Sequence, residues 1–279
     1  MLDKALDQPF GTFAPTPFQA RIIGLTRRQP DNWLGRRIAF FLRRLVLAGL
    51  DHPLDVAALG QNMRLYPFNN VCEKRILFTP QYFDAAEREL IASRAGDDFV
   101  FIDIGANVGG YALFVAGIAG SKARILAIEP QPVVFDRLVY NIAANAAGTV
   151  KAIACAIMDR DGDFTLFLDD DNRGGASIKT ISANDHGTSA LTVPAKTLLG
   201  LVREENLSHV DALKIDIEGA EDLVLVPFFR DAPRELSPRL IVMEQTSGRW
   251  QTDCVALALA KGYRQIATTR MNVVLELAS

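Results

Sequence analysis

The chain has 279 residues, 49% hydrophobic and 23% charged, which is typical of a globular protein with one large domain or a domain and an appendage. Its net charge of -3 conceals an asymmetry, because residues 1–50 contain eight Lys or Arg against three Asp, which leaves +5 there and -8 in the rest. The acidic remainder argues against a nucleic-acid partner, and three scattered cysteines argue against a metal knuckle or a disulfide framework.

The N-terminus lacks a basic start followed by an apolar segment, and no uninterrupted apolar run approaches the roughly 20 residues that span a bilayer. We therefore expect a cytoplasmic protein, with any membrane contact confined to the inner surface of the membrane.

Four prolines interrupt residues 1–33, which we expect to be irregular. Residues 34–50 have a helical pattern in which four arginines share one face: Arg36, Arg37, Arg43 and Arg44. Apolar side chains lie mostly opposite them: Leu34, Ile38, Phe41, Leu42 and Leu45. The favoured interpretation is a basic face in solvent, with the apolar stripe packed on the main domain. A basic amphipathic helix can instead lie on an anionic membrane surface, or contact a second subunit or another partner.

Short alternating segments at residues 63–66 and 75–78, separated by prolines and asparagines, indicate small strands within residues 53–83. A helix over residues 84–93 then leads into an α/β domain. We therefore divide the chain after residue 83, into an N-terminal appendage and a main domain formed by residues 84–279.

The most informative stretch begins with an apolar run at residues 99–102, which predicts a buried strand that ends at Asp103. Glycines follow, which permit a tight turn, and a helix is expected over residues 112–118 with its free N–H groups facing that turn. This is the first strand, loop and helix of a nucleotide-binding domain; an ordinary strand-to-helix turn is the alternative. Asn107 occupies the place of the second glycine of a dinucleotide-binding loop, and Asp103 repels phosphate. A cationic ligand without phosphates, such as S-adenosylmethionine, therefore fits better.

A second strand is predicted at residues 124–128, followed by a helix at residues 132–146. Glu129, at the tip of that strand and 24 residues beyond the first glycine of the loop, can accept hydrogen bonds from both hydroxyls of a ribose. A third strand is predicted over residues 151–157. Asp159 follows it, either within reach of an adenine amino group or as a plain turn residue.

Residues 163–193 interrupt the alternation of strands and helices. Strands are predicted at residues 164–168 and 191–193, and the long polar loop between them is typical of a lid or a binding loop. The candidate substrate-binding residues of this loop are Asn172, Ser177 and His186, although an isolated surface histidine is more often inert.

A helix over residues 195–206 precedes the second informative stretch. Strand alternation places Lys214, Asp216 and Glu218 on one side, at the C-terminal tip where ligands bind in open α/β sheets. Three charges at such a tip are useful in a cleft; the alternative is a lysine–carboxylate pair that stabilises the turn. Glu221 is expected to be an acidic residue in the first turn of a helix.

The last part of the chain predicts a strand at residues 240–243 that ends at Glu244, and a helix at residues 252–261. Strands at residues 263–267 and 272–277 are joined too closely for a crossover helix, so they must be antiparallel. A parallel sheet completed by an antiparallel hairpin suits a methyltransferase better than a dinucleotide-binding domain. Glu244 joins the candidate substrate-binding residues.

Four blocks carry a family resemblance: residues 103–111 (DIGANVGGY), 127–130 (AIEP), 172–177 (NRGGAS) and 214–221 (KIDIEGAE). Together they resemble the FkbM family of S-adenosylmethionine-dependent methyltransferases over about residues 98–246. The resemblance implies an α/β fold with a Rossmann-like, seven-stranded class I methyltransferase sheet and an antiparallel C-terminal hairpin, preceded here by a small N-terminal helical and β appendage. It also implies S-adenosylmethionine as cofactor, S-adenosylhomocysteine as product, and methylation of a hydroxyl on a sugar, glycolipid or polyketide.

The resemblance assigns roles residue by residue. The methionine part of the cofactor would be held by Asp103, Gly105, Asn107 and Gly109, the ribose by Glu129, and Asp159 would lie near the adenine. Ala106, Tyr111 and Pro130 complete the candidate cofactor-binding residues. Asp216 and Glu218 would face the transferred methyl. Leu199 stands where the family pattern usually has an aspartate, so no role is carried over to that position.

Methyl transfer from a sulfonium is an in-line displacement that depends on positioning, and an alcohol acceptor needs a base to remove its proton. Asp216 or Glu218 is the best-placed base, tuned or oriented by Lys214, and these three are the candidate catalytic residues. A divalent cation on Asp216, Glu218 and Glu244 is a less favoured alternative, and we predict no metal site.

The expected partner is a small-molecule acceptor or a saccharide, either free or lipid-linked, and not a nucleic acid. Two other classes of function stay open. The first is a nicotinamide-dependent oxidoreductase, which Asn107 and the C-terminal hairpin oppose. The second is a non-catalytic module in which the N-terminal region binds a membrane or a partner.

Overall fold

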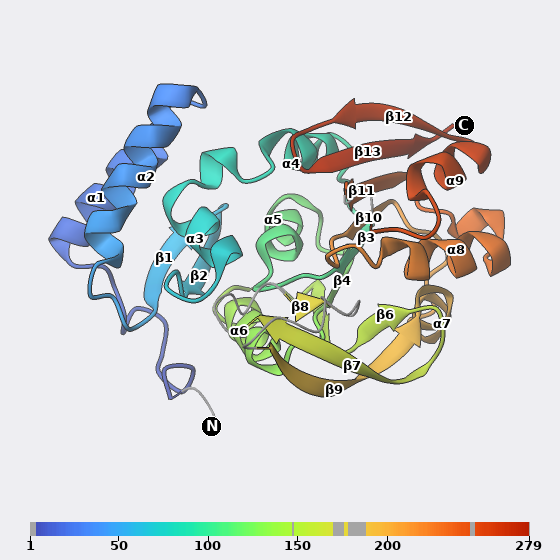
Figure 1. The fold of residues 1–279 in the computed structure, drawn as a ribbon, viewed down its shortest axis with the longest axis horizontal. Coiled ribbons are helices and arrows are strands. Elements are labelled where there is room, and N and C mark those ends of the chain that lie inside the picture. The colour runs from blue at the N-terminus through green and yellow to red at the C-terminus, as the bar shows by residue number, and fades with distance from the viewer. Residues whose placement is uncertain (1–3, 147, 170–175, 178–187, 246–248, 279) are drawn as a thin grey trace.

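The computed structural model describes residues 4–146, 148–169, 176–177, 188–245 and 249–278. At its centre is a seven-stranded sheet in the order β12-β13-β11-β10-β3-β4-β5 (Figure 1). Its strands are β3 (Val100–Ile104), β4 (Arg124–Ile128), β5 (Val150–Ile153), β10 (Ala212–Ile215), β11 (Leu240–Glu244), β12 (Tyr263–Thr268) and β13 (Asn272–Leu277). β13 runs antiparallel to both neighbours, whereas the pairs from β11 through β10, β3 and β4 to β5 are parallel. The sheet with its antiparallel C-terminal hairpin confirms the expected class I methyltransferase architecture.

The order of the strands reverses next to β3, because the chain leaves β3 for β4 and β5 and returns to β10 on its other side. In open α/β sheets, the carboxyl ends of the strands at such a reversal border the crevice where ligands bind. Lys214 of β10 pairs in register with Asp103 of β3, so the two informative motifs of the sequence meet at one edge.

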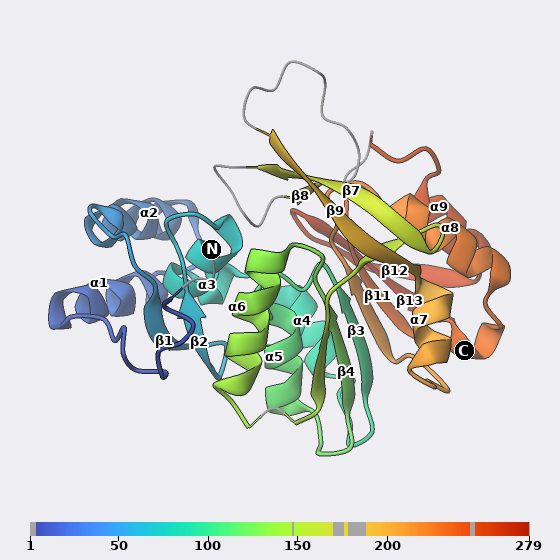
Figure 2. The same ribbon diagram turned by 90° about the horizontal axis from the view of Figure 1, so that it is seen from below.

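Helices cover both faces of this sheet (Figure 2). They are α4 (Ala85–Ala92), α5 (Gly110–Ile118), α6 (Pro132–Ala143), α7 (Leu198–Glu204), α8 (Glu221–Asp231) and α9 (Cys254–Ala260), with a short 3-10 turn η2 (Arg234–Leu236). Ile125 and Ala127 of β4 pack in the cluster with α5 and α6, and Leu126 and Ile128 pack in the cluster with α7, α8 and α9. A strand buried on both faces requires an apolar run, which is why these strands were readable from sequence.

The segment after β5 forms a second, four-stranded sheet in the order β6-β9-β7-β8. Its strands are β6 (Ala156–Met158), β7 (Gly162–Asp169), β8 (Ala176–Ser177) and β9 (Thr188–Thr197). The single strand predicted over residues 151–157 is therefore wrong, because the chain turns at residues 154–155 and β6 pairs with β9 instead of β4. The helix predicted from residue 195 begins at Leu198, since β9 continues to Thr197, whose Oγ1 accepts a capping hydrogen bond from the Gly200 N–H at 3.1 Å.

The N-terminal segment contains a helix that the sequence reading missed, α1 (Pro17–Arg27). Prolines led us to expect residues 1–33 to be irregular, but Pro17 stands in the first turn, where a missing N–H costs nothing. Thr16 and Gln19 form a reciprocal capping box at its start.

The small strands expected at residues 53–83 are half right. β1 (Leu54–Ala58) and β2 (Gln61–Leu65) form an antiparallel hairpin, but residues 75–78 belong to a helix, α3 (Val71–Phe78), followed by the 3-10 turn η1 (Pro80–Tyr82). Asn70 caps α3 by accepting a hydrogen bond from the Glu73 N–H at 3.2 Å. A four-residue alternation was too short to distinguish a strand from a helix.

The helix predicted at residues 34–50 is confirmed as α2 (Trp33–Leu47), but most of its apolar stripe is exposed, although Leu42 packs against the core cluster that includes α5 and α6. The buried residues of α2 are the small Gly35 and Ala39, and Val46, whereas Leu34 and Phe41 are 58% and 64% exposed. α1 and α2 lie side by side at the end of the molecule opposite α8 and α9 (Figures 1 and 2). Within the described ranges, no helix combines the length and apolar character needed to cross a bilayer.

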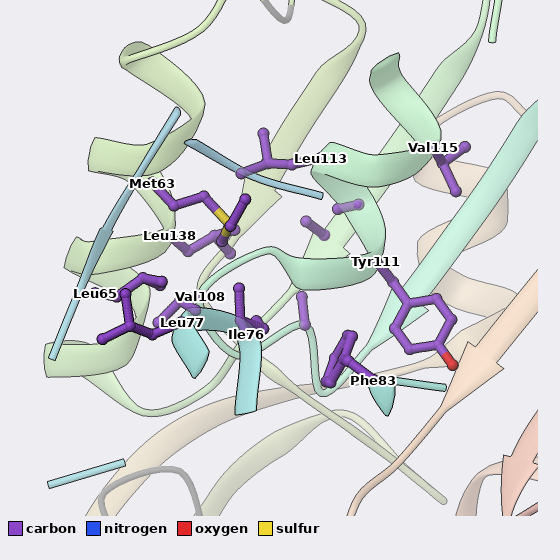
Figure 3. Close-up of a cluster of buried hydrophobic side chains, with 14 of the residues drawn as sticks. Met63, Leu65, Ile76, Leu77, Phe83, Val108, Tyr111, Leu113, Val115 and Leu138 are labelled. Carbon is purple, nitrogen blue, oxygen red and sulfur yellow. The ribbon is translucent and has the colours of Figure 1, made fainter. Parts of the chain in front are cut away.

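Buried side chains of the N-terminal segment pack directly on α5 and α6 (Figure 3). Met63 of β2 and Ile76 of α3 belong to the same core cluster as Leu113 of α5 and Leu138 of α6. The hairpin β1–β2 and α3 are therefore held against α5 and α6, the two helices that follow β3 and β4. The division at residue 83 stays a prediction from sequence.

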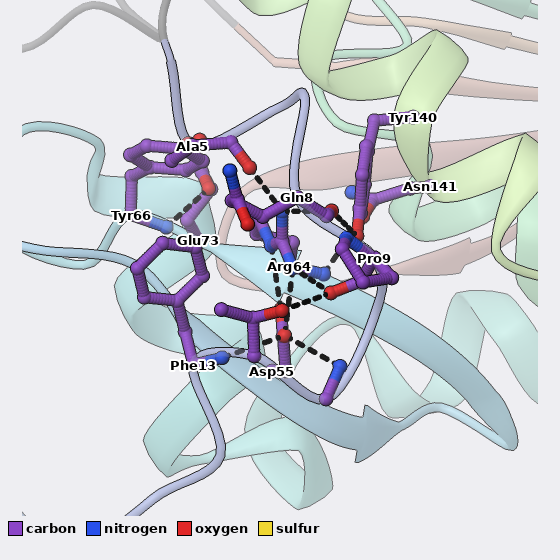
Figure 4. A network of polar contacts seen from close by, with 12 residues as sticks. Ala5, Gln8, Pro9, Phe13, Asp55, Arg64, Tyr66, Glu73, Tyr140 and Asn141 are labelled. Atoms are coloured by element: carbon purple, nitrogen blue, oxygen red, sulfur yellow. Dashed lines mark hydrogen bonds and ion pairs between the residues drawn. The ribbon is translucent and has the colours of Figure 1, made fainter.

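A buried ion pair organises the segment that precedes α1 (Figure 4). The Arg64 Nε lies 2.7 Å from the Asp55 Oδ1, and neither side chain is more than 1% exposed. The Arg64 guanidinium also donates to the carbonyls of Gln8 and Pro9, both at 2.9 Å, and lies 4.2 Å from the centre of the Tyr140 ring of α6. One charged group thus connects the N-terminal residues, the β1–β2 hairpin and α6.

Candidate functional site

The loop after β3 is shaped by Asp103 and Gly105. The Asp103 Oδ2 accepts a hydrogen bond from the Ala112 N–H of α5 at 3.1 Å, while its buried Oδ1 has no partner within the described part of the chain. Gly105 has a φ of +75°, and a Cβ there would lie 2.1 Å from the Asp216 carbonyl oxygen. Only glycine therefore lets this loop approach the end of β10.

Glu129, directly after β4, closes the other side of the same loop. Its two carboxylate oxygens accept hydrogen bonds from the N–H groups of Asn107 and Gln131, at 2.9 and 3.0 Å. Burial raises the pKa of Glu129 to about 7 and that of Asp103 to about 6. Asn107, with a φ of +50°, is held by a 2.9 Å hydrogen bond from the Asn70 side-chain amide, so its own side chain fixes the loop.

Lys214 and Asp216 form an ion pair at the end of β10. The Lys214 Nζ donates to the Asp216 Oδ2 at 2.9 Å and lies 5.3 Å from the centre of the Tyr111 ring. Burial disfavours the charge on Lys214, but Asp216 and Asp103 outweigh it and raise the Lys214 pKa. Burial would likewise raise the pKa of Asp216, but Lys214 holds it below its ordinary value. Both members of the pair are therefore ionised near neutral pH.

Glu218 and Glu244 complete the acidic rim. β10 ends at Ile215, and Glu218 follows in a left-handed conformation with a φ of +57°, so the regular alternation predicted through Glu218 stops earlier. Burial and the charge of Asp216 raise the pKa of Glu218. Glu244, at the end of β11, has a buried Oε2 without a hydrogen-bond partner among the described residues. Burial and repulsion from Asp216 and Glu218 raise its pKa to about 8.

The backbone between Asp216 and α8 is held by Glu221, which lies in the first turn of α8 as expected. Its Oε1 accepts hydrogen bonds from the N–H groups of Ile217 and Gly219, at 3.1 and 3.3 Å. Its Oε2 accepts a 2.6 Å hydrogen bond from the Trp250 Nε1. Glu221 is completely buried and acts on the position of the acidic loop rather than facing the cavity.

One cavity brings most of the predicted site residues together. Its lining includes Asp103, Gly105, Ala106, Asn107, Tyr111, Glu129, Pro130, Lys214, Asp216, Glu218 and Glu244. Gly109 is not part of this lining. It stands at the N-cap of α5, where a Cβ would come within 2.9 Å of the Leu138 Cδ1, so its role is to let α5 begin close to α6.

Asp159 lies apart from this cavity. It borders a separate hollow that is also lined by Asp161, Thr197 and Arg203, and it forms an ion pair of 3.3 Å with Arg160. Because β6 leaves the central sheet, the residue that follows it is carried away from the ends of β3 and β4. Asn172 and His186 lie outside the described residues, and only the backbone of Ser177, in β8, is described.

The sequence reading missed the contribution of the N-terminal segment to this cavity. The Arg75 Nη2 of α3 lies 2.9 Å from the Asp84 Oδ1, and the Tyr111 hydroxyl donates to the Asp84 Oδ2 at 3.2 Å. Arg75 and Asp84 both line the cavity, together with Val71 and Cys72. Asp84 also stands in a left-handed conformation at the start of α4, which the sequence did not predict.

Carboxyl groups dominate the lining of this cavity. Among the described residues of the lining, Asp84, Asp103, Glu129, Asp216, Glu218 and Glu244 are accompanied by two basic groups, Arg75 and Lys214. An excess of carboxylates in a partly buried space favours a cationic ligand and disfavours a phosphate. In the part of the chain that the structure describes, no group of three or more His, Cys, Asp or Glu is arranged to hold a metal ion.

The sequence of this chain is similar to those of known methyltransferases. The family model described as "Methyltransferase FkbM domain" matches residues 103–269. The methyltransferase sdnD of Sordaria araneosa is 29% identical over 176 residues, which cover 53% of this chain and 65% of that protein. The hexuronic acid methyltransferase AglP of Haloferax volcanii is 29% identical over 145 residues, which cover 49% of this chain and 52% of that protein.

Among solved structures, a methyltransferase FkbM from Methylobacillus flagellatus matches with a TM-score of 0.41 and 13% identity, over 89% of this chain and 61% of that one. The chain spans between half and two thirds of the length of the curated relatives named above. The family model extends from the end of β3 into the C-terminal hairpin, more than half of the chain, and this protein therefore belongs to the FkbM methyltransferase family.

Proposed function

We propose that the protein is an S-adenosylmethionine-dependent methyltransferase whose donor binds in the cavity between the ends of β3, β4 and β10. The observation that carries this proposal is that Asp103 and Glu129 line one cavity. The buried Asp103 Oδ1 has no hydrogen-bond partner among the residues that the structure describes, and a ligand ammonium would provide the donor that it needs. The close approach of Gly105 to the Asp216 carbonyl brings the loop after β3 and the end of β10 together at this cavity.

The residues present fit the donor. Glu129 would accept hydrogen bonds from the ribose hydroxyls, because its oxygens keep free lone pairs after binding two N–H groups. Asp103 would face the ammonium. The bound donor supplies an electrophilic methyl on a sulfonium. The protein contributes position and an electrostatic environment that favours a positively charged ligand over a neutral one.

A hydroxyl acceptor requires a group that removes its proton, and the structure favours Glu244 for this role. A general base works best with a pKa near the working pH, and that of Glu244 is about 8. Asp216 is a weaker base because Lys214 keeps its pKa low. In this arrangement Glu244 takes the proton, while the Lys214–Asp216 pair fixes the shape and charge of the rim.

For the acceptor we propose a hydroxyl oxygen on a sugar, a glycolipid or a polyketide. The support is the pairing of a candidate base with a donor site, and the family to which the chain belongs. The AglP relative is named for a hexuronic acid, which is consistent with a saccharide.

Titration calorimetry tests the donor. We expect S-adenosylmethionine and S-adenosylhomocysteine to bind and NADH not to bind, because a pyrophosphate would face the carboxylates of this cavity. Binding of NADH alone would indicate the oxidoreductase alternative and overturn the proposal. A screen of hydroxylated saccharides and lipid-linked sugars with labelled donor then tests transfer. Donor binding without transfer to any acceptor in the screen would favour the non-catalytic alternative.

A further inference from the structure

A second cavity, of about 570 Å³, adjoins the proposed donor cavity. The two share Val71, Arg75, Asp84 and Met271 in their linings. Its other walls come from α2, from the start of α4 and from the turn between β12 and β13. A methyl acceptor must lie next to the donor, so this neighbouring cavity is the natural place for it.

Basic side chains outnumber acidic side chains in the lining of this second cavity. Its lining holds four arginines (Arg36, Arg43, Arg75 and Arg270) and three acids (Asp31, Asp84 and Glu87). Asp31 lies 2.5 Å from the Arg36 Nε, and Asp84 pairs with Arg75. The buried Glu87 accepts hydrogen bonds from the Thr269 hydroxyl and the Asn272 amide.

Two arginines are left over from these pairs. Among the described residues, neither Arg43 nor Arg270 forms an ion pair with a carboxylate. Arg43 is partly buried on the inner side of α2, where it lies 4.3 Å from the centre of the Phe40 ring. Arg270 is exposed in the turn between β12 and β13. Two uncompensated guanidinium groups facing one cavity attract an anion.

We propose that this cavity binds the methyl acceptor through an anionic group, a carboxylate or a phosphate, held by Arg43 and Arg270. The proposal rests on the methyltransferase function proposed above and names its substrate class. The anionic group would lie on the side of α2 and of the β12–β13 turn, and the reacting hydroxyl would extend past the Arg75–Asp84 pair toward Glu244.

The test is titration calorimetry on full-length protein saturated with S-adenosylhomocysteine, with three probes: glucuronate, glucose 1-phosphate and glucose. We expect at least one of the charged sugars to bind more tightly than glucose by about tenfold or more, since a hydrogen bond between a guanidinium and an anion is stronger than one to a neutral hydroxyl. Arg43→Gln combined with Arg270→Gln should abolish that preference. The matched control is Arg37→Gln, on the outer side of the same helix, which should keep it.

The outcomes separate the two proposals. Equal affinity for charged and neutral sugars, or a preference that survives the loss of both arginines, would overturn the acceptor proposal while the donor site stands. The relative affinities of glucuronate and glucose 1-phosphate identify the anionic group. Failure of S-adenosylhomocysteine to bind in the same samples would instead contradict the proposed methyltransferase function.

A different observation carries a second proposal. Four apolar residues of α2 form an outward stripe at helical spacing: Leu34, Ile38, Phe41 and Leu45. Trp33, 71% exposed, lies at the start of this stripe, and the Arg37 guanidinium lies 4.9 Å from the centre of its ring. Monomeric proteins seldom expose such a continuous set of large apolar side chains without a partner.

The charge around this stripe indicates the partner. Neither α1 nor α2 contains an acidic residue, while the rest of the chain beyond residue 50 is acidic. Arg37 and Arg44, both exposed, flank the stripe. Contact between two copies through this face would bring like charges together, whereas an anionic lipid surface would neutralise them. We infer that this face of α2 lies on an anionic membrane surface.

Vesicle sedimentation tests this inference with phosphatidylcholine vesicles and with vesicles that also contain phosphatidylglycerol. We expect full-length protein to sediment only with the anionic vesicles, and Phe41→Ser or Leu34→Ser to lower the bound fraction severalfold. Leu259→Ser, which changes a similarly exposed leucine on α9, is the matched control and should bind normally. Absence of binding, or equal binding by all variants, would overturn the inference. So would a dimer in solution that Phe41→Ser dissociates.

Discussion

Glu244 illustrates how neighbours can set the reactivity of one residue. Its pKa of about 8 arises from burial and then from the charges of Asp216 and Glu218. A base acts only when it is deprotonated, so we expect kcat/KM for methyl transfer to increase with pH up to about 8. Glu244→Gln should lower kcat by about 10²–10⁴-fold and remove this dependence. A pH–rate profile that is the same in the variant would show that another group accepts the proton.

Gly105 is the residue at which the two informative motifs touch. In Gly105→Ala the new Cβ would overlap the Asp216 carbonyl, and the φ of +75° would be strained. We expect a loss of about 1–3 kcal/mol in the free energy of unfolding from strain alone, together with loss of S-adenosylhomocysteine binding. Denaturant unfolding and calorimetry measure the two effects. Gly148→Ala, at a glycine with open space around it, should change neither.

The sequence predicted those residues of the candidate site that lie at the ends of strands of the central sheet. Asp103, Glu129, Lys214 and Glu244 each stand at or near the C-terminal end of a buried strand, and parallel strands align these ends. Arg75 and Asp84 could not be found in this way, because their position depends on how α3 packs on the main domain.

At the scale of elements, Glu221 connects α8 to the acidic loop. In Glu221→Gln the amide nitrogen would face the Trp250 Nε1–H or the loop N–H groups, so one donor would lose its acceptor. We expect stability to fall by about 1.5–3 kcal/mol and kcat to fall severalfold, while affinity for S-adenosylhomocysteine stays within about twofold. Thermal unfolding, kinetics and calorimetry separate these effects.

The control for this substitution is Glu235→Gln, at an exposed acid in η2. It should leave stability and kcat unchanged. A Glu221→Gln enzyme with normal kcat would contradict a positioning role for Glu221.

Elements were predictable where their pattern was long or their ends carried clear signals. The strands of the central sheet were found because each is an apolar run bounded by turns, and the closing hairpin because its connection is short. α3 was misread because neither the capping of α3 by the Asn70 side chain nor the burial of the charged Glu73 was visible in a short alternation. β6 was joined to β5 because both are apolar and the turn between them lacks glycine or proline.

At the scale of the whole molecule, Arg64 ties the N-terminal residues to the rest of the protein. Arg64→Met leaves Asp55 buried without its cation, and breaking such a pair costs about 3–5 kcal/mol. We expect the midpoint of thermal unfolding to fall substantially and the segment before α1 to become sensitive to protease. Arg230→Met, at an exposed ion pair on α8, should leave the midpoint unchanged. Unaltered stability of Arg64→Met would show that this network does not hold the segment.

The assembly of the site could not be predicted from the motifs alone, because it depends on packing between distant parts of the chain. Ile76 and Phe83 pack against Gly110 and Tyr111, which places Arg75 and Asp84 beside the donor cavity. The N-terminal segment, which carries no recognisable motif, thus forms part of both cavities.

The most direct test of the whole account is the affinity of S-adenosylhomocysteine, measured by calorimetry, for wild-type protein and three single variants. We expect Asp103→Asn and Glu129→Gln each to weaken binding by at least about tenfold, or 1.4 kcal/mol. Asp159→Asn, at the acid that lies in a separate hollow, should bind as the wild type does. Unchanged affinity in the first two variants would contradict the assignment of the donor to the cavity lined by Asp103 and Glu129.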